Sequence, residues 1–288
     1  MKRTFYCPAD RFCSTEAIKG PSRRSESKIT TGLEQVRAKK FLGQHFLTDE
    51  RIAERIARSL SGLTRHLLEV GPGMGVLTKY LVDDPRYSFC AVEVDRESVD
   101  YLHSHYPSLA VVEGDFLRMD LGARYEGLPV SIIGNFPYNI SSQILFRVFE
   151  QRQQVPEVVG MFQKEVAERV AAGPGSKTYG ILSVLLSAFY DIEYLFTVDE
   201  HVFNPPPKVK SAVIRLRRNA VERLACDERR FVQVVKTSFN QRRKTLRNAL
   251  KPLGGDLSGV AEALLSKRAE QLSVADFVLL TNQIVFAE

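Results

Sequence analysis

The residues with the clearest chemical potential in this chain are Asn135, Pro137 and Tyr138. They follow the apolar run 130–134, so we expect them where a buried strand opens into a loop. The Asn135 side-chain oxygen can accept a hydrogen bond from an exocyclic amine, the proline turns a backbone carbonyl toward the same amine, and Tyr138 offers a flat face for stacking. Together these groups suit an adenine base. An ordinary strand-to-helix turn with a surface tyrosine accounts for them equally well.

A second candidate ligand segment is the glycine-containing sequence HLLEVGPGMG at 66–75. It predicts a short strand, a loop that includes Gly71, and a helix carried by the apolar residues of 76–81. Glycines let the backbone approach a ligand closely, and a helix N-terminus favours a negative or electron-rich group. The GxGxG spacing lacks the third glycine of GxGxxG, which disfavours a site for a dinucleotide pyrophosphate.

Two acidic residues stand at the ends of further predicted strands. Glu93 ends the strand at 89–94, where a carboxylate can accept both hydroxyls of a ribose from a dinucleotide or from S-adenosylmethionine. Asp95 is an alternative for that role. Asp115 follows the next strand and could accept from an adenine amine with Phe116 against the ring, unless it is a simple turn aspartate.

The segment at 39–49 mixes bases, aromatic residues and a glycine ahead of a predicted helix. Thr48 or Asp49 suits the helix cap, and the apolar face at 52–60 has helical spacing. Such a segment could fold over a ligand as a lid that carries His45 and Leu47. The alternative is that Leu47 is core and His45 is a surface residue.

Three prolines stiffen the loop 201–207, which lies between strands predicted at 192–198 and 212–216. A stiff loop can hold Phe203 in a fixed place. If the loop faces the Asn135 segment, Phe203 and Tyr138 would sandwich a base; otherwise Phe203 belongs to the core.

The order of the predicted elements indicates an α/β fold with a doubly wound, mostly parallel sheet of seven strands. The last two strands form an antiparallel pair, which is the methyltransferase variant of this fold. Ligands of such sheets bind at the carboxyl ends of the strands, so the sites described above are expected to converge there. We predict a flexible extension at 1–34, a catalytic domain at 35–219 and a small all-helical domain at 220–288.

Basic residues cluster on both sides of the boundary between the last two domains. Residues 201–219 and 236–251 contain no acidic side chain. Basic runs are usually solvated surface, but two of them beside an adenine-like pocket predict a track for RNA phosphates. The candidate RNA contacts in the first run are Lys208 and Lys210. Those in the second run, which is expected to form a helix, are Arg242, Arg243, Lys244 and Arg247.

Composition narrows the remaining possibilities. The net charge of +6 and the pI near 9.1 fit a polyanionic partner. The four cysteines, which include Cys7 and Cys13, form no CxxC pair, so no metal site is expected. No apolar run is long enough for a membrane span, and residues 1–34 lack a secretory signal, which indicates a cytoplasmic protein. Three acids in that extension argue against an organelle transit peptide.

Taken together, the chain resembles the rRNA adenine N6,N6-dimethyltransferases of the small ribosomal subunit, with the erythromycin-resistance methyltransferases as cousins. The resemblance runs from Lys39 to about residue 285; only the extension has no counterpart, and Phe136 stands where leucine is commoner. The matching motifs are GQHFL (43–47), EVGPGMG (69–75), Glu93 in AVEVD, Asp115 in GDF, NFPYNIS (135–141), QKEVAERV (163–170), FNPPPKVKSAV (203–213) and FNQRRKTLRN (239–248).

The resemblance implies a Rossmann-like class I fold and transfer of methyl groups from S-adenosylmethionine to N6 of two adjacent adenosines. The implied target is a 3′-terminal hairpin loop of 16S rRNA in the immature small subunit, with a role in its biogenesis, and we expect a monomer. The implied catalytic residues are Asn135, Pro137, Tyr138 and Phe203, and the implied cofactor contacts are His45, Leu47, Gly71, Glu93, Asp115 and Asn135.

The residues leave two rival functions open. Methylation of DNA adenine or of a glutamine amide would also suit an Asn-x-Pro-Tyr loop, although a basic helical domain argues against a small peptide target. The second rival function is a scaffold role, in which the protein times subunit maturation with or without methylation.

Overall fold

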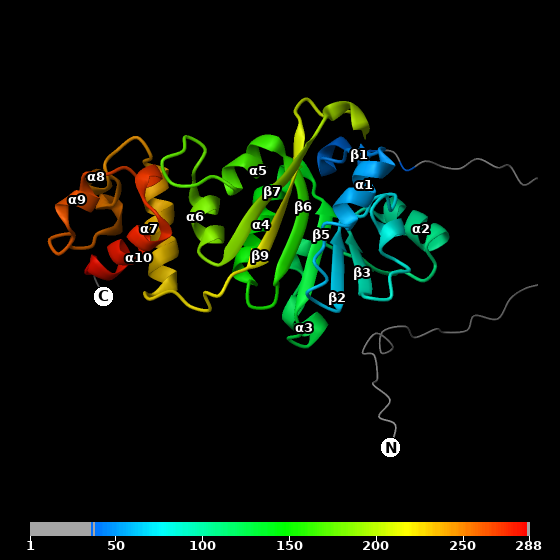
Figure 1. Cartoon of the computed structure of the whole chain (residues 1–288), viewed down its shortest axis with the longest axis horizontal. Coiled ribbons are helices and arrows are strands. Elements are labelled where there is room, and N and C mark those ends of the chain that lie inside the picture. Colours follow the sequence, from blue (N-terminus) through cyan, green and yellow to red (C-terminus); the bar gives the residue numbers. More distant parts are fainter. Residues whose placement is uncertain (1–35, 37, 287–288) are drawn as a thin grey trace, which may run out of the picture. The chain divides into compact units, whose positions relative to one another are not determined.

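A seven-stranded sheet forms the centre of the structure, a computed structural model that describes residue 36 and residues 38–286 (Figure 1). The predicted extension at 1–34, with Cys7 and Cys13, lies outside the described residues. Across the sheet the strands are β4 (Ala110–Glu113), β3 (Ser88–Glu93), β2 (His66–Val70), β5 (Val130–Asn135), β6 (Glu157–Gln163), β9 (Ser211–Arg218) and β7 (Tyr190–Val198).

The first five of these strands are parallel, and β9 runs antiparallel to both β6 and β7. Neighbouring residues on each strand enter different cores. Leu68 and Ile132 pack in the core on one face of the sheet, whereas Leu67 and Ile133 pack in the core on the other. Because both faces are covered, the central strands read as continuous apolar runs. The doubly wound sheet predicted from the sequence is confirmed.

Six helices connect or flank the strands in this part of the chain. The helix predicted after 39–49 begins as expected, because the Asp49 side chain accepts hydrogen bonds from the N–H groups of Arg51 and Ile52. The helices are α1 (Glu50–Ala57), α2 (Arg96–His105), α3 (Leu121–Tyr125), α4 (Ser141–Glu150), α5 (Lys164–Val170) and α6 (Ile181–Ser187).

The prediction of a helix after the glycine loop is wrong, because only a 3-10 turn, Thr78–Tyr80, forms there. Gly71, Gly73 and Gly75 all have positive φ, so a helical backbone can begin only after residue 75. Pro85 then disfavours helical geometry in the residue before it. This loop therefore has no helix N-terminus to offer a ligand.

The sequence also predicts that Ser141 caps the helix after the Asn135 loop and that another helix spans about 179–190. Both predictions need correction. Ser141 is the first residue of α4 and does not cap it; its hydroxyl instead donates to the Pro137 carbonyl at 3.0 Å. The helix expected at 179–190 is α6, and it ends at Ser187 because Tyr190 begins β7.

A two-stranded antiparallel ladder joins the segment before α1 to the proline loop. In it β1 (Phe46–Leu47) pairs with β8 (Phe203–Asn204), and Leu47 lies opposite Phe203. The ladder fixes two segments, more than 150 residues apart in sequence, beside the carboxyl ends of the central strands.

Between β9 and residue 286, the last one described, the chain forms only helices and turns apart from one isolated bridge, Asp256 with Val285. The helices are α7 (Glu228–Asn240), α8 (Leu246–Ala249), α9 (Glu262–Leu265) and α10 (Val274–Gln283). Helices α7 and α10 lie beside α6 (Figure 1). Phe231 of α7 and Phe277 of α10 belong to the same hydrophobic core as residues of α6 and of one face of the sheet. Among the described helices, none is long and apolar enough to cross a bilayer. A domain boundary at 219/220 stays a prediction.

The basic sequence FNQRRKTLRN does not form one helix, contrary to expectation. Helix α7 ends at Asn240, and Arg242, Arg243 and Lys244 occupy the turn before α8. A tertiary contact holds the turn in place, because the Arg242 guanidinium donates to the Lys177 carbonyl at 2.5 Å.

Candidate active site

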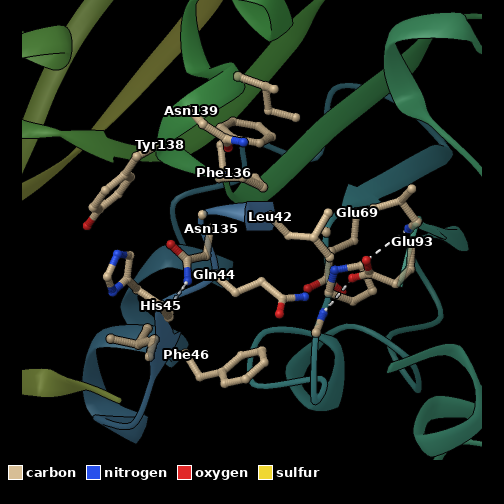
Figure 2. Close-up of a pocket in the computed structure, with 18 of the residues that line it drawn as sticks. Leu42, Gln44, His45, Phe46, Glu69, Glu93, Asn135, Phe136, Tyr138 and Asn139 are labelled. Atoms are coloured by element: carbon tan, nitrogen blue, oxygen red, sulfur yellow. Dashed lines mark hydrogen bonds between the residues drawn. The ribbon is translucent and has the colours of Figure 1, made fainter. Parts of the chain in front are cut away.

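A cavity opens at the carboxyl ends of β2, β3 and β5 (Figure 2). The segment 42–47, the glycine loop and the residues after β5 form most of its wall. The cavity brings together all six residues that the resemblance assigns to the cofactor, which are His45, Leu47, Gly71, Glu93, Asp115 and Asn135. Pro137 and Tyr138 line it as well.

Burial of Phe136 holds the Asn135 loop at the cavity wall. Its side chain is 1% exposed and packs closely over Gly134 and Gly160. A Cβ at Gly160 would lie 2.2 Å from the Phe136 ring, and one at Gly134 would lie 2.6 Å from the Val70 carbonyl oxygen. The Phe136 N–H also donates to the Met161 carbonyl at 3.2 Å. The two glycines in β5 and β6 thus make room for the ring that positions the loop.

The Asn135 side chain has a fixed orientation. Its amide nitrogen donates to the His45 carbonyl at 3.0 Å, which leaves its oxygen as an acceptor for a ligand (Figure 2). The Pro137 carbonyl already accepts from Ser141 and Ile140. No N–H or O–H among the described residues donates to the Phe136 carbonyl, so that carbonyl is the second available acceptor in the loop.

Tyr138 is held at both ends of its side chain. Its hydroxyl shares a hydrogen bond with Ser211, and burial raises its pKa. Its ring stacks on His45, with 5.2 Å between the ring centroids and 29° between the planes. The His45 Nδ1–H donates to the Pro205 carbonyl at 2.7 Å.

Two aromatic residues assigned to the site from sequence belong to the core instead. Phe203 is 4% exposed and packs in the same core cluster as Leu47, so the sandwich of a base between Phe203 and Tyr138 is not present in this structure. Phe116 is also 4% exposed, and Leu117 lines the cavity in its place. Asp115 lines the cavity while its carboxylate accepts from the Leu117 N–H at 2.9 Å.

Glu93 has the environment of a ligand-binding carboxylate. It is 4% exposed, and its oxygens accept from the N–H groups of Gly73, Val94 and Asp95 at 2.9 to 3.1 Å. Burial raises its pKa, although these hydrogen bonds oppose the shift. Oε1 accepts two of these bonds and Oε2 only the one from Gly73, so Oε2 keeps a lone pair for a ribose hydroxyl.

Asp95, the alternative, does not line the cavity. It accepts from Lys39 at 2.5 Å and from Ser98 at 3.0 Å. Burial alone would raise its pKa, but the hydrogen bonds from Lys39 and Ser98 leave the pKa below its usual value. The geometry therefore favours Glu93 for the ribose.

The cavity fits S-adenosylmethionine by the chemistry of its lining. Gly71 has φ of +70°, a backbone conformation that side chains disfavour, and a Cβ added there would lie 3.7 Å from the Pro137 ring, which also lines the cavity. A buried carboxylate, apolar residues such as Leu117 and the Asn135 amide complete a site for a ribose, an adenine and a reacting centre.

We expect Glu93→Gln to weaken S-adenosylmethionine binding by about 10- to 100-fold, because one hydrogen bond to a charged group is lost. Glutamine is the sharper choice, since it keeps a side-chain oxygen as an acceptor, whereas alanine would leave the N–H groups of Gly73, Val94 and Asp95 all without one. Calorimetry with the cofactor measures the effect, with Asp95→Asn as the matched variant. A larger loss of affinity in Asp95→Asn than in Glu93→Gln would transfer the ribose role to Asp95.

Glu69 lines the cavity and was not identified as a site residue from sequence. It is 1% exposed, and burial raises its pKa to about 8, while the Thr78 hydroxyl donates to it at 2.6 Å. The available signal was a single carboxylate within an otherwise apolar strand, HLLEV, directly before the glycine loop.

The pKa of Glu69 predicts a pH-dependent cofactor affinity. At pH 7 the carboxyl is mostly protonated, and a cation in the cavity favours its ionised form. Binding of the cationic cofactor should therefore release a proton below pH 8, and affinity should rise toward pH 8 by up to about tenfold per pH unit. Calorimetry in buffers of different ionisation enthalpy measures how many protons are released when the cofactor binds. In Glu69→Gln only titration of the ligand's own amino group should remain; an unchanged profile would contradict the assignment.

The predicted RNA contacts lie outside the cavity lining, and the structure divides them into two groups. Lys210 pairs with Asp199 at 2.5 Å, Arg242 binds the Lys177 carbonyl, and Arg247 pairs with Glu262. The other three are exposed and form no ion pair within the described part of the chain: Lys208, Arg243 and Lys244. No cluster of three or more His, Cys, Asp or Glu side chains among the described residues could hold a metal ion.

Comparisons with known proteins agree with this geometry. A family model described as ribosomal RNA adenine dimethylase matches residues 35–284. A Bacteroides thetaiotaomicron protein named ribosomal RNA small subunit methyltransferase A is 60% identical over 253 residues, which cover 86% of this chain and 94% of the relative. A Cytophaga hutchinsonii protein of the same name is 58% identical over 256 residues, which cover 88% of this chain and 99% of the relative.

One solved structure supports the fold. A dimethyladenosine transferase from Plasmodium falciparum superposes with a TM-score of 0.66 at 23% identity, covering 84% of this chain and 100% of that chain.

Proposed function

Because the chain belongs to the ribosomal RNA adenine dimethylase family, we propose that it dimethylates N6 of two adjacent adenosines in the 3′-terminal hairpin loop of 16S rRNA. We propose further that it acts as a monomer on the immature small ribosomal subunit and contributes to its biogenesis. The family resemblance seen in the sequence is confirmed, and the chain is a methyltransferase that modifies ribosomal RNA and uses S-adenosylmethionine.

The orientation of Asn135 carries the proposal. Its oxygen and the Phe136 carbonyl are two acceptors on one rigid loop, and an exocyclic amine has two N–H groups to donate. Hydrogen bonds to both would pull N6 toward tetrahedral geometry and free its lone pair, which is otherwise delocalised into the ring. When bound, S-adenosylmethionine supplies an electrophilic methyl group. Transfer of the methyl group releases the neutral thioether and leaves a positive charge on N6, which is lost as a proton to solvent. The role of the loop is therefore to position and polarise the amine, and no basic side chain is needed.

Methylation at C5 of cytosine would need a cysteine nucleophile to activate the ring carbon. Of the cysteines in the described residues, Cys90 is buried in β3 and Cys226 precedes α7, and neither lines the cavity. This arrangement favours an amine target over C5 of cytosine.

Mass spectrometry of small-subunit rRNA tests the proposal directly. Cells that lack this gene should lose dimethyladenosine, and the purified protein should restore it on their immature subunits with S-adenosylmethionine. Retention of the modification in the deletion strain would refute the assigned substrate.

We propose that the exposed basic residues Arg243 and Lys244 contact RNA phosphates. Replacing both with alanine should weaken subunit binding and lower the slope of log affinity against log salt by roughly 1.5, since two fewer counterions are released. Arg65→Ala with Arg223→Ala removes the same charge from exposed positions elsewhere. Filter binding across salt concentrations distinguishes the pairs. Equal slopes for both would mean that the turn before α8 is ordinary solvated surface.

A further inference from the structure

One phenyl ring is exposed in a way that the other aromatic side chains are not. Phe41 is 78% exposed, the highest value among the large apolar side chains of the described residues, and Tyr194 at 37% is the only other exposed aromatic residue there. Isolated apolar residues on a surface are common and need no explanation by themselves. The position of Phe41 is what distinguishes it, and neither cofactor binding nor amine activation uses its ring.

Phe41 lies at the rim of the cavity. It is the middle residue of the 3-10 turn Lys40–Leu42, and Leu42 lines the cavity. The Phe41 carbonyl accepts from the Asn139 amide at 3.4 Å, and Asn139 is also a lining residue, drawn with Leu42 in Figure 2. Phe41 itself is not a lining residue. Its exposed ring therefore faces solvent at the edge of the cavity, next to the loop that carries Asn135.

We propose that Phe41 and Lys40 bind the nucleotide next to the adenosine that occupies the cavity. This inference rests on the proposed function, in which two target adenosines are adjacent in a loop. An adenosine that enters the cavity must leave the stack in its strand, which uncovers one face of the neighbouring base. A phenyl ring at the rim can cover that face, whichever base it is, because every base has a π-face. The same ring can therefore serve both adenosines of the pair, although their neighbours differ.

The charge beside the ring also fits a nucleotide. Lys39 and Lys40 are adjacent, but the Lys39 ammonium binds Asp95 at 2.5 Å and Glu97 at 3.1 Å. Lys40 is exposed and forms no ion pair with another described residue. Proteins that bind single-stranded RNA combine cations that contact phosphates with aromatic rings that stack on bases. Lys40 and Phe41 supply one of each at neighbouring positions.

The turn that carries both side chains is held in place before RNA arrives. The ion pairs of Lys39 fix its start to the beginning of α2, and the Gly43 N–H donates to the Lys40 carbonyl at 3.1 Å. A Cβ at Gly43 would lie 2.7 Å from the Asn139 Oδ1 atom, so the backbone packs directly against the loop after β5. A contact whose backbone is preorganised in this way needs little further ordering when RNA binds.

The first test measures KM for immature small subunits at saturating S-adenosylmethionine. Phe41→Ala should raise KM by about 5- to 150-fold, the effect of losing one stacking partner. Phe41→Leu keeps an apolar side chain without a flat face and should be equally impaired, whereas Phe41→Trp should behave as the wild type. The calorimetric affinity for S-adenosylmethionine should not change, because Phe41 does not line the cavity.

The matched control for this test is Leu63→Ala. Leu63 is an apolar residue that is 57% exposed. It precedes β2, so it lies at the opposite edge of the sheet from the cavity, which is at the carboxyl ends of the strands. This variant should leave KM unchanged.

The second test uses a hairpin RNA and requires no turnover. The chain contains no tryptophan, so Phe41→Trp places a single indole at the rim and Leu63→Trp places one at the control position. Stacking on a base should quench the fluorescence of Phe41→Trp and leave that of Leu63→Trp unchanged. Two further hairpins carry an abasic nucleotide directly 5′ or directly 3′ of the target adenosine, and one of them should abolish the quenching.

The role of Lys40 is tested by the salt dependence of RNA binding. Lys40→Ala should lower the slope of log affinity against log salt by roughly 0.7, the value for one phosphate contact to a single strand. Arg65→Ala, which removes an exposed charge from the segment before β2, should leave the slope unchanged. An unchanged slope in Lys40→Ala would refute the phosphate contact.

Three results would overturn the role of Phe41. An unchanged KM in Phe41→Ala would show that the ring has no part in RNA binding, and a normal KM in Phe41→Leu would mean that the contact is apolar and not stacked. Quenching that survives both abasic hairpins would place the ring on another group. Absence of dimethyladenosine with the wild-type protein would refute the proposed function, while the fluorescence titration would still decide the role of Phe41.

Discussion

Asn135→Ala is expected to slow methyl transfer by about 10²-fold or more, the loss typical of removing one positioned polar group at a reacting centre. The Asn135 oxygen is one of the two acceptors that the proposed mechanism needs. The Phe136 carbonyl is the other, and the Pro137 carbonyl cannot take the place of Asn135 because it already accepts from Ser141 and Ile140. Single-turnover methylation of immature subunits at saturating S-adenosylmethionine measures the chemical step without a contribution from cofactor affinity.

Asn139→Ala is the matched control for this experiment. It removes the same side chain from the same loop, but the Asn139 amide only donates to the Phe41 carbonyl at 3.4 Å. If the two variants were equally impaired, loss of loop structure would be the cause. Subunit binding should survive in Asn135→Ala, so a strain that carries this variant also tests the scaffold role. Normal subunit maturation in that strain would show that binding suffices.

Tyr138→Ala is expected to weaken retention of the target base by about 1 to 3 kcal/mol, the range measured for removal of a stacking aromatic residue. Tyr138→Phe keeps the ring and should retain most of the activity, because stacking depends on the ring. The phenylalanine variant does lose the hydrogen bond to Ser211. Measurement of KM and kcat on immature subunits therefore separates loss of the ring from loss of this hydrogen bond. Tyr138→Ala should act mainly on KM.

Ser211→Ala separates the anchoring and chemical roles of the Tyr138 hydroxyl. It leaves the phenol in place and removes only its partner, a serine that is 0% exposed. If Tyr138→Phe and Ser211→Ala were both as inactive as Tyr138→Ala, the hydroxyl would act by anchoring the ring. If Tyr138→Phe alone were inactive, the hydroxyl would take part in the reaction, and a mechanism of positioning alone would have to be withdrawn.

The sequence determined the central fold and the location of the site. Apolar runs marked the strands, and Gly71, Glu93, Asp115 and Asn135 each follow or end one of them. In a parallel sheet these strand ends meet at one edge, so a linear pattern was enough to predict that the four residues would share a cavity. Local rules also narrowed the cap to Thr48 or Asp49, because a cap depends only on residues within one turn, and the structure selects Asp49.

Tertiary structure decided which way side chains face and which partners they meet. The pairing of β1 with β8 buries Phe203 and brings Pro205 to His45, and neither contact is visible in residues so far apart in the chain. The same holds for Arg242, whose bond to Lys177 shapes the basic turn. Glu69 owes its raised pKa to burial, which depends on everything packed around it. Local sequence sets the conformation of each segment, but burial and long-range contacts arise only when the segments pack together.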